Sequence, residues 1–335
     1  MRVLLGSGGF RTPERLAFLR QKMRAHFGGI RQLLFVPYAL RDHDAYVAMM
    51  KERGLDAEYD LVGLHTLPDP VEAVMRAEGV FVGGGNTFRL LGELYGRGLL
   101  GVLASRARNG LPYLGVSAGC NVACPTIKTT NDMPITLPPS LDALGLVPFQ
   151  VNAHYFTGHH FVKEGESLVE HFGETRDERL REFHEMNATP VVGLYEGGTL
   201  DCAGGKVLLE GSRARVFRRG TEPVDAEAGT DLAPLLAARP VAYTVTVTIG
   251  DPAPEAEWLA WMRGKHLADV RAAGADAAEL VGLEGRRWEA RYRFSSREAF
   301  AAYERDHAPR LRAEGLARFP AERGFAYART LGDIG

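Results

Sequence analysis

The chain has 335 residues, of which 45% are hydrophobic and 24% are charged, and its formal net charge is -2. This length exceeds the usual limit of one hydrophobic core, which favours two domains, and the composition is that of a globular protein rather than a disordered one. The balance of charges argues against the basic surface that nucleic-acid binding needs, so we expect small-molecule partners and no nucleic acid.

No apolar run approaches the roughly 20 residues that span a bilayer, and the opening MRVLLGSGGF is typical of a strand and a glycine turn, not of a signal peptide. We therefore expect a cytoplasmic protein without membrane contact. Cys120, Cys124 and Cys202 are too few, and odd in number, for a secreted disulfide framework. The first two are spaced for metal binding, but no second pair completes a site, and we interpret them as buried thiols.

Short aliphatic or β-branched runs alternate with amphipathic segments through the first two thirds of the chain. This pattern predicts parallel strands joined by helices, in a three-layer α/β domain. Helices are indicated at residues 42–53, at residues 70–77 and after Thr12, which would cap a helix beginning at Pro13. The expected strands are residues 3–5, 33–36, 57–64, 79–82, 113–116 and 191–194.

The composition shifts to Ala, Leu and Pro at residues 226–240, which predicts a linker there. We therefore expect two domains, at residues 1–230 and at residues 240–335. A ferredoxin-like α+β domain is predicted beyond the linker, because the elements follow the order βαββαβ. The predicted strands are residues 241–249, 277–283, 287–294 and 324–331, and the predicted helices are residues 255–273 and 296–316. Helices cover one face of such a sheet, so we expect a homodimer in which a second copy covers the other.

The segment GVSAG at residues 115–119 follows an apolar strand and precedes a helix. A Gly-x-Ser-x-Gly turn in that position is typical of a nucleophile elbow, whose strained turn lifts the serine hydroxyl out of the chain. The five-residue pattern is weak by itself, since such a turn can be purely structural. In its strand context we favour Ser117 as a nucleophile, with the amide of Ala118 directed to the substrate carbonyl.

A second glycine cluster, GGGNTF at residues 83–88, also follows a strand and opens a helix. Bare amides at a helix N-terminus bind anions, so a phosphate site is one interpretation. The segment lacks the Lys-Ser/Thr ending of a P-loop and the spacing of a dinucleotide-binding turn. Beside a nucleophile elbow, the amides of Gly84 and Gly85 are better interpreted as oxyanion donors.

A serine nucleophile needs a base, and the base needs an orienting group. We favour His154 as the base because it ends a predicted strand at a loop, although a structural loop histidine fits the sequence about equally well. Glu196, just past an apolar strand, and Asp132 are the candidate orienting carboxylates, and the residues alone leave the choice between them open.

Histidines at residues 159, 160 and 171 also lie close together in the sequence. Their spacing matches no zinc motif, so metal binding is the weaker interpretation. We expect neither a metal nor an organic cofactor, because a serine, a histidine and a carboxylate suffice for acyl transfer.

Four segments together closely resemble peptidase E, the aspartyl dipeptidase family: VGGGNTF at residues 82–88, GVSAGCNVACPTIKTTND at residues 115–132, NAH at residues 152–154 and GETR at residues 173–176. The resemblance covers about residues 1–225. It implies a fold like that of the class I glutamine amidotransferases, with serine as the nucleophile in place of cysteine. It also implies the roles given above to Ser117 and His154, with Glu196 preferred to Asp132 as the third member.

The resemblance further implies how substrate is bound. Arg176 would bind the side-chain carboxylate of an N-terminal aspartate, which suits a guanidinium fork, and Asn86 and Asn131 would also bind substrate. Without the resemblance, Arg176 would be interpreted as an ordinary charged residue at the solvent-exposed start of a helix. The sequence departs from the family in that Val116 replaces a frequent tryptophan, the stretch between His154 and Arg176 is longer than usual, and about a hundred C-terminal residues are added.

These observations predict a serine exopeptidase that hydrolyses small peptides, namely dipeptides with an N-terminal aspartate, through an acyl-enzyme. The alternatives are a cyanophycinase-like hydrolase of β-aspartyl peptides and a catalytically silent binding module. The C-terminal segment resembles an uncharacterised ferredoxin-like family related to dimeric α+β barrels, and that resemblance implies no activity.

Overall fold

The computed structural model describes residues 1–56, 58–159, 161–170, 172–237 and 240–334. It consists of two compact units, Met1–Leu236 and Ala237–Gly335. Each unit has its own buried apolar cluster. No helix in the described ranges is long and apolar enough to cross a bilayer.

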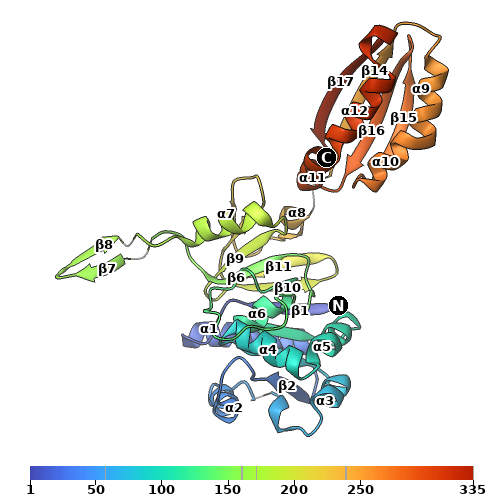
Figure 1. Cartoon of the computed structure of the whole chain (residues 1–335). Helices are drawn as coiled ribbons and strands as arrows, with labels where there is room; N and C mark the ends of the chain where they lie inside the picture. The colour runs from blue at the N-terminus through green and yellow to red at the C-terminus, as the bar shows by residue number, and fades with distance from the viewer. Residues whose placement is uncertain (57, 160, 171, 238–239, 335) are drawn as a thin grey trace. The chain divides into compact units, whose positions relative to one another are not determined.

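A seven-stranded sheet with the order β11-β10-β1-β5-β4-β2-β3 forms the centre of the first unit (Figure 1). Five strands are parallel, whereas β10 and β11 run antiparallel at the edge beside β1. The parallel sheet that we predicted is therefore formed by five strands only, because a hairpin with positive φ at Gly204 and Gly205 adds two antiparallel strands beside β1. The strands are β1 (Arg2–Gly6), β2 (Gln32–Val36), β3 (Asp60–Gly63), β4 (Val80–Val82), β5 (Tyr113–Val116), β10 (Thr199–Ala203) and β11 (Lys206–Glu210).

Helices cover both faces of this sheet. Successive residues of β1 point to opposite faces, so Leu4 packs with one group of helices and Leu5 with the other. The first group is α1 (Pro13–Phe27) and α2 (His43–Glu52). The second is α3 (Pro70–Arg76), α4 (Thr87–Gly96), α5 (Leu99–Arg108) and α6 (Ala118–Ala123), and a 3₁₀ turn, Leu64–Thr66, follows β3. Thr12 caps α1 and Pro13 begins it, as predicted.

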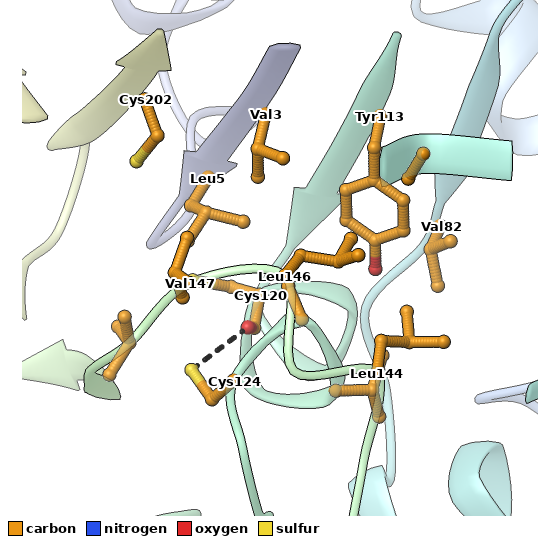
Figure 2. Close-up of a cluster of buried hydrophobic side chains, with 14 of the residues drawn as sticks. Val3, Leu5, Val82, Tyr113, Cys120, Cys124, Leu144, Leu146, Val147 and Cys202 are labelled. Carbon is orange, nitrogen blue, oxygen red and sulfur yellow. Dashed lines mark hydrogen bonds between the residues drawn. The ribbon is translucent and has the colours of Figure 1, made fainter. Parts of the chain in front are cut away.

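Figure 2 shows the core around α6, where Cys120 and Cys124 lie among aliphatic side chains of the sheet and of the loop after the helix. The Cys124 thiol donates to the carbonyl oxygen of Cys120 at 3.5 Å. Burial raises the pKa of both thiols, that of Cys124 to about 12. Both cysteines are core residues, as we interpreted them from the sequence.

A second sheet of the first unit has the order β13-β12-β9-β6. Its strands are β6 (Gln150–Tyr155), β9 (Val191–Tyr195), β12 (Ala214–Phe217) and β13 (Val224–Ala226), and α7 (Arg176–Met186) packs on it through Leu180. The strand predicted at residues 191–194 therefore forms, but outside the main sheet. β6 and β9 are parallel to each other, which brings their carboxyl ends together.

The long stretch between His154 and Arg176 contains a separate two-stranded hairpin, β7 (Phe161–Glu164) and β8 (Ser167–Glu170) (Figure 1). Every residue of both strands is exposed. The hairpin thus adds length to this segment without adding to the core of the unit.

The second unit has an antiparallel sheet of order β15-β16-β14-β17, and its elements follow the predicted βαββαβ order. The strands are β14 (Val241–Ile249), β15 (Ala277–Leu283), β16 (Arg287–Phe294) and β17 (Phe325–Asp333). A π-helical turn, Met262–His266, divides the first predicted helix, and a break at His307 divides the second. The helices are α9 (Glu255–Trp261), α10 (Leu267–Ala272), α11 (Arg297–Asp306) and α12 (Ala308–Arg318), with a 3₁₀ turn at Ala321–Arg323, and α8 (Ala233–Leu236) lies in the predicted linker.

Candidate functional site

Five strands of the first unit end around one pocket. Ser7, Gly84 and Ser117 follow the carboxyl ends of the parallel strands β1, β4 and β5. His154 lies near the end of β6, and Glu196 directly follows β9. The pocket has a volume of about 280 Å³, and its lining includes Gly84, Ser117, His154 and Glu196. Ligands of α/β proteins bind at the carboxyl ends of parallel strands, so this pocket is the candidate active site.

The turn from β5 into α6 has the geometry of a nucleophile elbow. Ser117 has φ 56° and ψ -111°, a conformation that L-residues rarely adopt. A Cβ on Gly115 would lie 2.2 Å from the carbonyl oxygen of Gly119, and one on Gly119 would lie 2.1 Å from that of Val82. The two glycines of the motif are therefore required by close backbone contacts, and the turn presents the Ser117 hydroxyl to the pocket.

Ser117, His154 and Glu196 form a continuous chain of hydrogen bonds. Ser117 Oγ lies 2.9 Å from His154 Nε2, and His154 Nδ1 lies 2.5 Å from Glu196 Oε2. Because an ionised carboxylate only accepts, His154 carries its proton on Nδ1, which leaves Nε2 to accept from the serine hydroxyl. This hydrogen bond is the largest cause that lowers the pKa of Glu196 below its ordinary value, and partial burial acts against it.

A buried serine holds the backbone of His154 in place. His154 has φ 55°, at an irregularity in the pairing of β6 with β9. Its backbone N–H donates to Ser7 Oγ at 2.7 Å, and the Ser7 hydroxyl donates to the carbonyl oxygen of Leu194 at 2.9 Å. Ser7 is fully buried. Our sequence analysis missed this residue, although a hydroxyl directly after β1 in a glycine-rich turn is a signal of a strand-end role.

Asp132 lies in a different hydrogen-bond network. Its Oδ2 atom accepts from the Thr87 backbone N–H at 2.8 Å, from Thr87 Oγ1 at 2.5 Å and from Thr130 Oγ1 at 3.2 Å. Thr87 is the first residue of α4. Asp132 therefore anchors the N-terminus of this helix, and in the described part of the chain it has no hydrogen bond to His154.

The predicted oxyanion donors lie beside Ser117. A Cβ on Gly84 would come within 2.9 Å of the Cβ of Ser117, so this backbone directly faces the serine. Gly85 has φ 135°, and Ala118 is the first residue of α6. Tyr46 lines the same pocket, and burial raises the pKa of its hydroxyl to about 12. Tyr46 is a neutral polar group of the pocket that our sequence analysis missed.

Arg176, the first residue of α7, does not line this pocket. Its guanidinium lies over the ring of Phe156, 4.9 Å from the centroid. Its Nε and Nη1 atoms are buried and have no hydrogen-bond partner among the residues that the structure describes, and burial is the largest cause that lowers its pKa. Two other arginines, Arg11 and Arg53, line the pocket itself and were missed by our sequence analysis.

The side chains of Asn86 and Asn131 make local hydrogen bonds. Asn86 caps α4 by accepting from the Arg89 N–H at 3.0 Å, and its Nδ2 donates to the Met133 carbonyl at 2.8 Å. Asn131 Nδ2 donates to the carbonyl oxygen of Ala153 at 2.8 Å, next to His154. The first asparagine thus organises the start of α4, and the second supports the end of β6.

The histidine cluster is only partly described. His159 Nδ1 lies 3.1 Å from Glu170 Oε1 in the hairpin region, and His160 and His171 lie outside the described residues. Within the described ranges, no group of three or more His, Cys, Asp or Glu side chains could hold a metal ion.

At the strand ends of an α/β sheet, a serine that is hydrogen bonded to a histidine, which is itself hydrogen bonded to a carboxylate, is the arrangement of a hydrolase site. The model of peptidase family S51 matches residues 3–209, and this chain belongs to that family. A second model, a domain of unknown function (DUF4286), matches residues 241–332.

Two relatives and one solved structure illustrate the likeness. The chain is 51% identical over 209 residues to a peptidase E of Streptomyces coelicolor, covering 62% of this chain and 83% of the relative. It is 46% identical over 209 residues to a probable alpha-aspartyl dipeptidase of Drosophila melanogaster, covering 62% and 81%. The crystal structure of a peptidase from an acI-B1 actinobacterium is 17% identical in sequence, and the match covers 69% of this chain and 95% of the chain in the crystal. The TM-score of 0.51 shows that the two share a fold.

Proposed function

We propose that the first unit is a serine peptidase that hydrolyses dipeptides with an N-terminal aspartate through an acyl-enzyme. The observation that carries the proposal is the chain of hydrogen bonds from Ser117 through His154 to Glu196 at the candidate pocket. The aspartyl specificity is supported by the name of the relative from Drosophila melanogaster, a probable alpha-aspartyl dipeptidase.

In the proposed reaction Ser117 Oγ attacks the peptide carbonyl carbon while its proton passes to His154 Nε2. His154 then gives this proton to the leaving amine, so the peptide bond breaks and an acyl-enzyme remains. A water molecule next loses a proton to His154 and attacks the ester, which releases aspartate and returns the proton to Ser117. Glu196 holds the imidazole in the required tautomer and stabilises its positive charge.

The tetrahedral intermediate needs hydrogen-bond donors for its oxyanion. We assign this role to the backbone amides of Ala118, Gly84 and Gly85. Two facts support the assignment: the backbone of Gly84 faces Ser117, and Ala118 directly follows Ser117 in the chain, at the start of α6. Amides in such positions are fixed before the reaction, so they stabilise the developing charge without reorganisation.

We assign recognition of the aspartate side chain to Arg176. A buried guanidinium whose Nε and Nη1 lack acceptors is costly, and a substrate carboxylate would remove that cost through charge-assisted hydrogen bonds. Arg11 and Arg53 are the competing cations, because they line the pocket that holds Ser117.

The central test is the variant Ser117→Ala, assayed with Asp-Leu, Glu-Leu, Leu-Asp and β-Asp-Arg. Wild type should hydrolyse Asp-Leu and the variant should not, because the change removes only the nucleophilic hydroxyl. Ser105→Ala, an exposed serine of α5, is the matched control and should keep full activity. Undiminished turnover by purified Ser117→Ala would refute the mechanism. A wild type that prefers β-Asp-Arg would favour the cyanophycinase-like alternative, and one inactive on all four would favour a binding module.

A further inference from the structure

The second unit contains a cavity that the proposed peptidase reaction does not use. It has a volume of about 60 Å³ and lies between the sheet and the helical side of this unit. Aliphatic and aromatic side chains form most of its walls, among them Val245, Val247 and Tyr292 of the sheet. Leu316 and Arg329 also line it and are exposed, so they stand at its mouth.

Three polar atoms of the cavity lining are buried without a hydrogen-bond partner in the described part of the chain: Trp261 Nε1, His266 Nδ1 and Arg312 Nε. The Trp261 side chain belongs to a residue that is only 7% exposed. Buried polar groups in native proteins are almost always hydrogen bonded, because an unpaired one costs free energy. Three such atoms in residues that line one cavity make it a candidate site for a polar group of a ligand.

The π-helical turn brings two of these side chains together. The N–H of Leu267 donates to the carbonyl of Met262, five residues earlier, as a π turn requires. This winding puts Trp261 and His266, also five residues apart, on one side of the helix, where their rings stack with centroids 4.5 Å apart. Burial lowers the pKa of His266 to about 4, so the imidazole is neutral at pH 7. π turns occur often at functional sites.

The charged groups at the cavity favour an anion. Arg312 Nη2 donates to Glu304 and, at 3.1 Å, to the Tyr243 hydroxyl, while its Nε remains unpaired. Arg329 at the mouth has no ion pair among the described residues. Two guanidinium groups therefore accompany one carboxylate. The indole N–H of Trp261 is also only a donor, which suits an acceptor ligand.

We propose that this cavity binds a short-chain aliphatic carboxylate, whose oxygens accept from Trp261 Nε1 and Arg312 Nε and whose alkyl group contacts the apolar wall. The size of the cavity sets the size of the ligand. One water-sized group needs about 10–15 Å³ of such volume, so the cavity holds roughly four to six non-hydrogen atoms, as in acetate, propionate or butyrate. An aromatic acid is too large, because a benzene-binding cavity measures about 150 Å³.

The chain contains its own probe for this site. All three tryptophans, Trp258, Trp261 and Trp288, belong to the second unit, so tryptophan fluorescence of the full chain reports on this unit alone. We expect a saturable fluorescence change on titration with propionate. Propionamide, which has nearly the same shape without the charge, should bind at least about tenfold more weakly, because it loses the charge-assisted hydrogen bonds. No saturable change with propionate, or equal binding of both compounds, would overturn the proposal.

Two matched variants locate the ligand. Trp261→Phe keeps an aromatic ring in the cavity but removes the unpaired N–H, and calorimetry should show propionate binding about three- to tenfold weaker than wild type. Trp288→Phe is the control: its Nε1 already donates to Glu255 at 2.8 Å and it does not line the cavity, so affinity should not change. Circular dichroism checks that both variants fold. Wild-type affinity in Trp261→Phe, or equal losses in both variants, would show that the ligand binds elsewhere.

Discussion

At the scale of single residues, the contacts of His154 and Asp132 distinguish two carboxylates that look alike in the sequence. Glu196 accepts from the imidazole, whereas Asp132 accepts from the first residue of α4. An amide in place of a triad carboxylate keeps the shape but loses the charge that stabilises the imidazolium. We therefore expect Glu196→Gln to lower kcat for Asp-Leu by a factor on the order of 10⁴.

The companion variant, Asp132→Asn, should affect stability more than rate. An amide at this position can still accept one of the hydrogen bonds from Thr87 but loses the charge at the helix N-terminus, which stabilises by about 0.3–1 kcal/mol. Urea unfolding and steady-state kinetics on both variants separate the two effects. If Asp132→Asn lowered kcat far more than Glu196→Gln, the assignment of Glu196 would have to be reversed.

The specificity proposal also concerns single residues. Arg176→Ala should lower kcat/KM for Asp-Leu at least about tenfold, because charge-assisted hydrogen bonds contribute about 1.5–3 kcal/mol each. Arg176→Lys should restore only part of this loss, since an ammonium group lacks the fork. Arg179→Ala, an exposed position on the same helix, is the control. Arg53→Ala tests the competing cation, which lines the pocket that holds Ser117. If Arg53→Ala lost the preference for Asp over Asn at the first position of the dipeptide and Arg176→Ala kept it, Arg53 and not Arg176 would bind the aspartate side chain.

At the scale of elements, Ser7 joins the two sheets that share the candidate site. It follows β1 of the main sheet and binds His154 of β6 and Leu194 of β9 in the second sheet. Ser7→Ala leaves the part-buried N–H of His154 and the buried carbonyl of Leu194 without this partner, so we expect a loss of about 1–3 kcal/mol in the free energy of unfolding. Because His154 would also lose its backbone support, kcat for Asp-Leu should fall as well.

Two measurements test this role of Ser7. Urea unfolding gives the stability, and Ser105→Ala again serves as the exposed control. A purely structural role would lower stability and leave kcat of the folded enzyme unchanged. A Ser7→Ala protein with both wild-type stability and wild-type kcat would contradict the idea that this serine links the two sheets.

At the scale of the whole molecule, all proposed catalytic residues lie within Met1–Leu236, and this unit has its own core. We therefore expect a fragment of residues 1–236 to fold and to keep the kcat of the full chain for Asp-Leu. Circular dichroism and kinetics on the purified fragment check this expectation. A folded fragment without activity would show that the second unit contributes to catalysis.

The predicted homodimer rested on a sheet face that a second copy would have to cover. In the second unit, that face includes Thr244 and Thr246 of β14, which lie opposite Arg291 and Glu289 of β16. A polar face of this kind can contact water without loss of free energy, so the uncovered sheet does not by itself require a partner. The homodimer stays a prediction.

Local patterns in the sequence determined much of this protein. The Gly-x-Ser-x-Gly segment after an apolar strand predicted the elbow at Ser117, since a strand, a tight turn and a helix start depend on neighbouring residues. The strands β14, β15 and β16 have the predicted bounds because their alternating patterns end at clear turns, which are also local features of the sequence. The hairpin of β10 and β11 had a signal too, in Gly204 and Gly205 between two alternating runs, which our sequence analysis overlooked.

Only the tertiary structure decided which distant residues meet. The choice between Glu196 and Asp132 depends on the parallel pairing of β6 with β9, which brings positions 154 and 196 together across a second sheet. The role of Ser7 and the unpaired atoms of the cavity in the second unit depend in the same way on contacts between separate elements. The pattern of residues along the chain determines where a helix or strand begins and ends and which of its faces is apolar. The hydrogen-bond partner of a buried polar group is determined instead by how separate elements pack, because few arrangements satisfy the distances and angles of a hydrogen bond.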